Sequence, residues 1–230
     1  MNPTAIDLAF PIVQGLVVPI DHGHCLLGAL KSAAPALAEM DIAVHPLRGS
    51  ALPADLLHLK PRTRLRLRLR PEAIALVLAL AGRELRLGSH LIRLGAPTIE
   101  VLIPRVILHA RTVVLAKTVP KATRGEQRGN RFADEAEILL AVKSRCNASA
   151  TVRSLGRRSF VIRKPGRDIR IPGIGVVVEG LDDDASMRLQ TEGVGGRRAF
   201  GCGIFVTAGP VPHGMVGVAT AEAGNEVGHA

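Results

Sequence analysis

The chain has 230 residues, of which 47% are hydrophobic, and a formal net charge of +10 with a pI of about 10.7. That hydrophobic content is enough for a packed core, which excludes a disordered chain, and the strong basic excess points to a polyanionic partner. No apolar stretch approaches the roughly 20 residues that span a bilayer, and the N-terminus lacks a signal-peptide pattern, so we expect a cytoplasmic protein without membrane contact.

The composition also limits the kinds of site. Cys25, Cys146 and Cys202 form no CxxC motif, which argues against a zinc knuckle or a disulfide framework. Trp and Tyr are absent and there are five Phe. Because proteins that read single strands usually stack bases on aromatic rings, we expect this chain to bind phosphates more than it stacks bases.

The first half predicts the order β-α-β-β-α-β. Its elements are an apolar strand (5–13), a helix (19–37), a short strand with a turn (41–50), an alternating strand (62–70), a second helix (71–82) and a closing hairpin (83–103). Asp21 is a plausible N-cap of the first helix. Pro71 and Gly82 suit the start and end of the second.

The alternating strand "RTRLRLRLR" places its leucines on one face and its arginines on the other. No acid lies among the arginines, so they repel one another unless a polyanion is bound. A solvated strand face is the alternative interpretation. We favour RNA contact for the basic face, formed by Arg62, Arg64, Arg66, Arg68 and Arg70.

The second half repeats the order less clearly. We expect a strand (107–119), a basic loop (120–131), a helix (132–146), a hairpin (159–171), a short helix (182–193) and a last strand (202–208). The hairpin turns at Pro165-Gly166, a pair suited to a type II turn. The loop supplies further candidate RNA contacts, namely Lys121, Arg124, Arg128 and Arg131.

These elements predict an α+β protein with two tandem ferredoxin-like (βαββαβ) domains. The boundary falls near Pro104, which gives an N-terminal domain over 1–104 and a C-terminal domain over 105–207. The Gly/Ala-rich segment 208–230 has no periodicity, so we expect a flexible tail.

The stretch "GVGGRRAFGCG", residues 193–203, is the most specific motif. A dinucleotide-binding loop is disfavoured because Arg198 occupies the third glycine position and a strand follows. A plain helix-to-strand loop remains an alternative, since glycine permits positive φ. Arg197 and Arg198 favour a phosphate cradle, in which backbone N–H groups and two guanidinium groups hold the anion.

The motif fits Gly-x-Gly, five residues with a basic one, then Gly-x-Gly, formed by Gly193, Gly195, Gly201 and Gly203. It resembles the C-terminal glycine-rich loop of the RAMP superfamily of CRISPR-associated proteins. With "VPIDHGHCLLGAL" and "VHPLRG", the chain over about 1–207 resembles the CRISPR repeat-RNA processing endoribonucleases. The resemblance implies two ferredoxin-like domains, a bound repeat hairpin and metal-free cleavage at its 3′ base. It also implies other CRISPR-associated subunits of an effector complex as partners.

The resemblance further implies attack of a 2′-hydroxyl on the adjacent phosphate, with histidine as base or acid and a cation on the developing charge. His45 best matches the family's catalytic histidine. Many members place a tyrosine on the first helix, which this chain lacks, and Lys31 or His24 is expected to substitute. We expect no cofactor.

Several alternatives remain open at these histidines. His22 fits a helix start or a polar gap in the core. His45, which precedes Pro46, fits a residue at a strand end that has no catalytic role. His22 and His24 together are only a weak hint of a metal site, and we expect no metal. A non-catalytic RNA-binding subunit of the same superfamily would keep the glycine loop without needing a histidine. A ribosomal or RRM-type binder is a weaker alternative, since "RAFGCGIFV" resembles an RNA-stacking strand but lies in the wrong strand of the unit.

Overall fold

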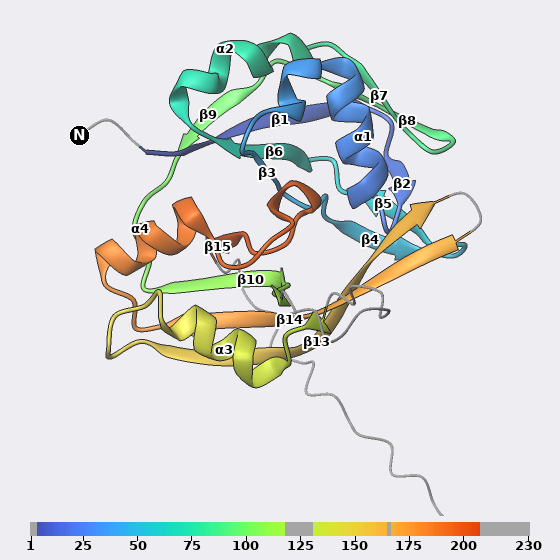
Figure 1. Ribbon diagram of the computed structural model, residues 1–230. Helices are drawn as coiled ribbons and strands as arrows, with labels where there is room; N and C mark the ends of the chain where they lie inside the picture. The colour runs from blue at the N-terminus through green and yellow to red at the C-terminus, as the bar shows by residue number, and fades with distance from the viewer. Residues whose placement is uncertain (1–3, 118–130, 165–166, 208–230) are drawn as a thin grey trace, which may run out of the picture.

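The computed structural model describes residues 4–117, 131–164 and 167–207, without the side chains of residues 131, 163 and 164. The fold mixes helices with antiparallel sheets, as expected. In Figure 1 the first half forms the upper part of the view and the second half the lower part, with the segment before the last strand between them. Residues 118–130, which hold most of the basic loop expected over 120–131, and the segment 208–230, expected to be a flexible tail, lie outside the described residues.

The first sheet has the strand order β3-β6-β1-β8-β7, with β9 also paired to β1. Its strands are β1 (Ile6–Gln14), β3 (Ala43–Val44), β6 (Arg64–Leu69), β7 (Glu84–Leu87), β8 (His90–Leu94) and β9 (Thr98–Val101). Helix α1 (Gly23–Ala33) buries Leu26, Leu27 and Leu30 on one face of this sheet, against leucines of β1 and β6. The other face of the sheet is turned toward the second half.

Both helices of the first half differ from the prediction. The first is shorter than 19–37, and its N-cap is His22, without a side-chain cap, instead of Asp21. A 3₁₀ turn, η1 (Pro35–Ala38), follows it because Pro35 cannot continue the hydrogen-bonded helix. The predicted helix 71–82 is broken into η2 (Pro71–Ala73), α2 (Ile74–Val77) and η3 (Leu78–Leu80).

A small sheet that the sequence did not predict joins β2 (Val17–Pro19), β5 (Leu56–Leu59) and β4 (Gly49–Leu52) in that order. It brings the segment after β3 back beside the start of α1. A two-stranded pair, β11 (Ala116–Lys117) with β12 (Arg131–Phe132), lies in the second half.

The second sheet has the strand order β13-β14-β10-β15. Its strands are β10 (Ile107–Val113), β13 (Thr151–Lys164), β14 (Arg167–Glu179) and β15 (Phe205–Thr207). β13 and β14 form a much longer hairpin than the 159–171 predicted. Helices α3 (Glu135–Lys143) and α4 (Asp183–Glu192) pack on this sheet and form a separate core with it.

The caps of these helices follow local sequence rules. Asp134 and Glu137 form a capping box at α3. Asp182 caps α4, whose C-cap Gly193 has a φ of +67°. Among the described residues, no helix is long and apolar enough to cross a membrane.

Candidate functional site

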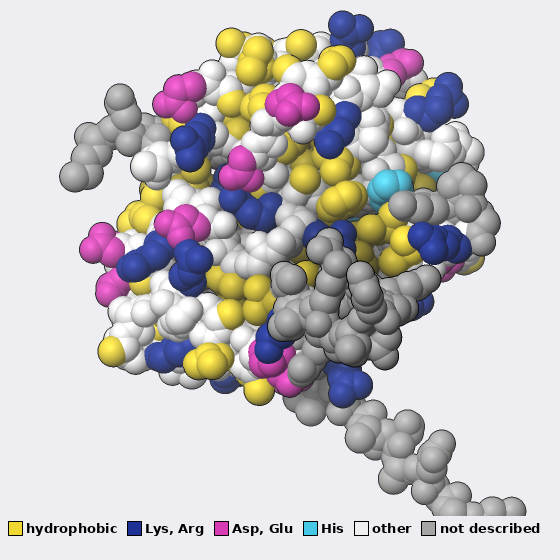
Figure 2. Space-filling model, viewed as in Figure 1, with side chains coloured by type: hydrophobic (Ala, Val, Ile, Leu, Met, Phe, Trp, Pro, Cys, Tyr) yellow, Lys and Arg dark blue, Asp and Glu magenta, His cyan; other side chains and the backbone are white. Residues whose placement is uncertain are grey.

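A cleft of about 720 Å³ lies between the two sheets. Lys and Arg side chains from both walls line it: Arg48, Lys60, Arg62, Arg64, Arg66, Arg68, Arg105 and Arg111. The acids that line it are Asp7 and Glu100. Figure 2 shows the Lys and Arg side chains of the visible face scattered among acidic and apolar ones, without a single basic patch there. The cleft is therefore the described cavity whose charge best suits a polyanion.

The alternation predicted for β6 is confirmed. Leu65 and Leu67 are buried in the first core, whereas Arg64 and Arg66 line the cleft. The expectation that no acid neutralises this face is wrong, because β9 lies nearby and contributes Glu100. Arg66 Nε donates to Glu100 Oε2 at 2.8 Å, and Arg64 Nη1 lies 4.0 Å from Glu100 Oε1. These side chains remain 37–40% exposed, so a ligand can still reach them.

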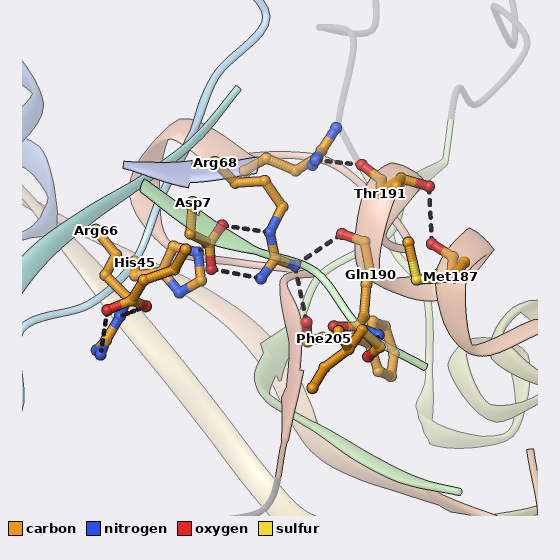
Figure 3. A network of polar contacts seen from close by, with 11 residues as sticks. Asp7, His45, Arg66, Arg68, Met187, Gln190, Thr191 and Phe205 are labelled. Atoms are coloured by element: carbon orange, nitrogen blue, oxygen red, sulfur yellow. Dashed lines mark hydrogen bonds and ion pairs between the residues drawn. The ribbon is translucent and has the colours of Figure 1, made fainter. Parts of the chain in front are cut away.

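Arg68 has a different role from the one predicted. Its side chain is 2% exposed, and its Nε and Nη2 donate to the two carboxylate oxygens of Asp7 at 2.7 and 2.8 Å. Its Nη1 donates to the carbonyls of Gln190 and Phe205 at 2.7 and 2.9 Å (Figure 3). Since four of its five N–H groups are committed to these partners, Arg68 is a buried link between the two halves, and the prediction that it contacts RNA is wrong for this structure.

His45 lies directly after β3, where its backbone N–H donates to the carbonyl of Arg66 at 2.9 Å. The side chain is 11% exposed, and its Nε2 lies 3.4 Å from Asp7 Oδ1. Burial lowers the pKa of His45 below its ordinary value, and the nearby Asp7 only partly opposes this effect. The imidazole is therefore neutral near pH 7, as a general base must be.

His22 is held as a structural residue. Its Nδ1 donates to the carbonyl of Pro19 at 3.0 Å, and its Nε2 accepts from the backbone N–H of Leu47 at 2.9 Å. The side chain is buried, and burial lowers its pKa. Both ring nitrogens are thus used to tie the start of α1 to the segment after His45.

His24 and Lys31 lie at opposite ends of α1. The ring of His24 stacks on that of Phe200 with centroids 6.1 Å apart, and its Nδ1 is buried without a partner among the described residues. Lys31 is exposed in the last turn of the helix, about two turns away. His45 lines the cleft and the small cavity described next, and neither His24 nor Lys31 lines either of them. The structure therefore does not bring the three predicted catalytic residues together.

A second, small cavity of about 70 Å³ lies where α1, the loop after β3 and the glycine-rich loop meet. Its lining includes His22, His45, Arg111, Phe160 and Phe200. His45 and Arg111 also line the cleft. These two residues are therefore shared by both cavities.

The glycine-rich loop needs its glycines for its own fold. Gly193, Gly195, Gly201 and Gly203 all have positive φ values, between +66° and +89°. A Cβ on Gly195 would lie 2.2 Å from the carbonyl oxygen of Val114, and one on Gly201 would lie 2.7 Å from Pro46 Cγ. The glycines thus permit both the left-handed backbone and the close approach of the loop to the residue after His45.

The backbone N–H groups of this loop are largely engaged, contrary to the predicted phosphate cradle. Val194 donates to Gly203, Gly203 to Thr112, and Gly196 to Val114. The Arg198 guanidinium is partly occupied too, because its Nη2 donates to the carbonyl of Thr191 at 2.7 Å and its Nη1 lies 3.6 Å from Asp41 Oδ2. Its Nε is buried without a hydrogen-bond partner among the described residues. The loop can therefore bind an anion mainly through side chains.

Arg197 remains available on this loop. It has a φ of +67°, a strained value for a residue with a side chain. Its guanidinium carbon lies 5.9 Å from the ring centroid of Phe160. Phe160 in turn stacks on Phe200 at 5.7 Å. This row of groups, which ends at His24, joins the glycine-rich loop to β13 and α1.

Sequence reasoning missed several residues of the cleft, among them Asp7, Arg48, His109 and Arg111. Asp7 and His109 each interrupt an apolar strand, a local signal that could have identified them. Arg48 and Arg111 carry no such signal. Desolvation lowers the pKa of Arg111, and the nearby Arg48 lowers it further. The pKa of His109 is also lowered by burial, and its Nδ1 has no hydrogen-bond partner among the described residues.

Some predicted contacts cannot be placed. Lys121, Arg124 and Arg128 lie outside the described residues, and the side chain of Arg131 is not described. In the described part of the chain, no group of three or more His, Cys, Asp or Glu side chains could hold a metal ion.

The fold resembles several solved structures. A CRISPR-associated protein Cas6 aligns with a TM-score of 0.61 at 15% identity, over 89% of this chain and 99% of that one. A Cas6-related gene product from Pyrococcus furiosus aligns with a TM-score of 0.62 at 12% identity, over 88% and 97%. A third, described as a RAMP protein binding different RNA substrates, aligns with a TM-score of 0.57 at 12% identity, over 87% and 98%. At these identities the likeness shows the fold alone.

The sequence itself gives the family. A CRISPR-associated endonuclease Cas6 from Myxococcus xanthus (strain DK1622) is 35% identical over 207 residues, which cover 89% of this chain and 82% of that protein. The family model described as Cas6 Crispr matches residues 6–209. The chain belongs to the Cas6 family of CRISPR-associated proteins.

Proposed function

We propose that this protein is an endoribonuclease that binds CRISPR repeat RNA and cuts precursor transcripts into guide RNAs. The observation that carries the proposal is the position of His45, a neutral histidine where a basic cleft meets the glycine-rich loop. The family relationship supports it, since the Myxococcus xanthus relative is named as an endonuclease.

The proposed reaction is attack of a ribose 2′-hydroxyl on the adjacent phosphate. The O–P bond that forms closes a 2′,3′-cyclic phosphate, and the bond that breaks releases a 5′-hydroxyl. His45 accepts the proton of the attacking hydroxyl. A protonated general acid supplies the proton of the leaving oxygen.

A cation must stabilise the charge that develops on the phosphate. Arg111 is the best-placed candidate because, like His45, it lines both cavities. Lys31, the cation expected from the sequence, lies at the far end of α1. We therefore assign this role to Arg111.

The RNA path we propose follows the cleft. Exposed or half-exposed guanidinium groups of Arg62, Arg64 and Arg66 bind backbone phosphates along one wall. Arg197 extends this path onto the glycine-rich loop. The two walls belong to two ferredoxin-like domains, 1–104 and 105–207. The element order β10-α3-β13-β14-α4-β15 with strand order β13-β14-β10-β15 supports this division. We further propose that the protein works in the cytoplasm with other CRISPR-associated subunits.

The test is to incubate the purified protein with its cognate repeat RNA in the presence of EDTA. We expect cleavage at one position, with a product that carries a 2′,3′-cyclic phosphate and resists phosphatase until the ring is opened. Cleavage that stops on chelation and returns with magnesium would contradict the proposed chemistry.

One observation favours a second candidate, a non-catalytic RNA-binding subunit. His45 is only 11% exposed and lies beside a carboxylate, an arrangement that a purely structural histidine also shows. The same gel separates the two functions: this subunit would shift the RNA without cutting it.

A further inference from the structure

A chain of polar contacts runs from His45 to the second half of the molecule (Figure 3). His45 Nε2 lies 3.4 Å from Asp7 Oδ1. Both oxygens of Asp7 accept hydrogen bonds from Arg68 at 2.7 and 2.8 Å. Arg68 also donates to the carbonyl of Gln190 in α4 and to that of Phe205 in β15.

Burial restricts the two charged side chains at the centre of these contacts. Asp7 is 6% exposed and Arg68 is 2% exposed. Their registers on adjacent strands place them side by side, since Asp7 of β1 pairs with Arg68 of β6. A carboxylate held by both oxygens in a dry environment has no freedom to turn away, so it keeps a fixed negative charge 3.4 Å from His45 Nε2.

We infer that Asp7 is a positioning residue that holds the His45 ring with Nε2 as the protonated nitrogen, and that Arg68 holds Asp7 in place and links it to the second half. The inference rests on the proposed function. Nε2 is buried, forms no hydrogen bond among the described residues and lies 3.4 Å from Asp7 Oδ1. In the proposed arrangement its proton faces this carboxylate, which leaves Nδ1 to meet the 2′-hydroxyl. The partner of one ring nitrogen fixes the role of the other.

The charges around His45 make this role measurable. Asp7 raises the pKa of His45, whereas burial lowers it, and so do Arg68 and Arg66 of β6. Glu100 of β9 faces the same cleft and is paired with Arg66, and Arg48 and Arg111 line the cleft as well. Removing Asp7 or Arg68 therefore shifts the pKa of His45 in opposite directions, although both changes break the same ion pair.

The experiment compares single-turnover cleavage by wild type, Asp7→Asn and Arg68→Gln across a pH series. In the plot of cleavage rate against pH, the limb that is present in wild type and absent in His45→Gln reports the titration of His45. We expect Asp7→Asn to move this limb to lower pH, and Arg68→Gln to move it to higher pH, each by about one unit. Arg68→Lys restores the charge and is expected to return the limb toward its wild-type position.

Matched controls are Glu84→Gln and Arg93→Gln, which break an ion pair of the same chemistry on β7 and β8, outside the cleft lining. They should leave the limb where it is. A purely structural ion pair would lower stability in both test variants without opposite shifts, and that result would overturn the inference. If wild type itself does not cut the RNA, the proposed function fails instead.

If the variants do not fold, the intact protein still decides the question. The ¹⁵N shifts of the neutral His45 ring report which nitrogen carries the proton. We expect the Nε2–H form. An Nδ1–H form would place Asp7 outside the catalytic machinery.

Discussion

At the scale of the residue, His22 and His45 show how partners decide what a histidine can do. Both are buried enough for desolvation to lower their pKa. His22 uses both ring nitrogens for backbone contacts, with Pro19 and Leu47. His45 has one nitrogen beside Asp7 and lines both cavities. Of these two residues, only His45 therefore has a nitrogen available for chemistry.

His45→Gln should lower the cleavage rate by about 10²- to 10⁴-fold, the usual contribution of a general base. RNA affinity should stay within a few-fold, because a neutral imidazole adds little to the binding of a polyanion. Single-turnover cleavage and filter binding measure the two effects.

The matched variant is His22→Gln. It should lower the free energy of unfolding by about 1–3 kcal/mol, since the carbonyl of Pro19 loses the Nδ1–H donor, while the folded fraction cleaves at a near-normal rate. Normal cleavage by His45→Gln, together with an inactive but folded and RNA-binding His24→Ala, would move the base to α1.

At the scale of the element, the glycines of the glycine-rich loop are needed first for the fold of the loop itself and not for binding. The sequence motif correctly indicated a helix-to-strand loop with positive φ at Gly193, Gly195, Gly201 and Gly203. It did not indicate that backbone N–H groups of the loop would donate to carbonyls of β10 and of the loop itself. Local sequence reports the backbone conformations that are allowed, but not the carbonyls that come within reach.

Two neighbouring glycines of this loop give a matched test. Gly195→Ala places a Cβ 2.2 Å from the carbonyl oxygen of Val114 at a φ of +82°, so it should lower the free energy of unfolding by at least about 1–3 kcal/mol. Gly196 has no atom within 4 Å of its added Cβ. Gly196→Ala should change stability by less than about 0.5 kcal/mol. Urea unfolding measures both, and equal losses would show that the loop tolerates a Cβ at either position.

The broken helix over 71–80 shows where element prediction failed. Its sequence is apolar nearly throughout, yet Val77 and Leu80 are buried while Leu76 and Leu78 are exposed. Residues three apart share a face in both α- and 3₁₀-helices, so the pattern could not distinguish them. Packing against the first core decided the outcome.

At the scale of the whole molecule, part of the basic excess behind the net charge of +10 lines one cleft. Docking of the two halves buries Arg68 and leaves a cleft whose walls both carry arginines. Because these groups face each other across a shared space, one RNA strand can contact both walls.

Arg62→Gln with Arg64→Gln should lower the slope of log affinity against log salt by about 1.4, if each arginine neutralises one phosphate of a single strand. The control, Arg86→Gln with Arg93→Gln, removes the same charge outside the cleft lining. It should leave the slope nearly unchanged. Equal changes in the two double variants, measured by titration at several salt concentrations, would argue against the cleft as the RNA path.

The sequence by itself determined the mixed α and β fold, the alternating face of β6, the caps of α3 and α4 and the glycine-rich loop. These features depend on residues a few positions apart, whose spacing directly sets which backbone and which face is favoured. It also pointed to His45, through the family resemblance. Only the tertiary structure decided what surrounds that histidine. Asp7 and Arg68 are 61 positions apart in the chain, and Arg68 and Gln190 are 122 apart. No local pattern encodes such contacts, because they form only when strand register and the docking of the two halves bring distant polar groups into the same buried space.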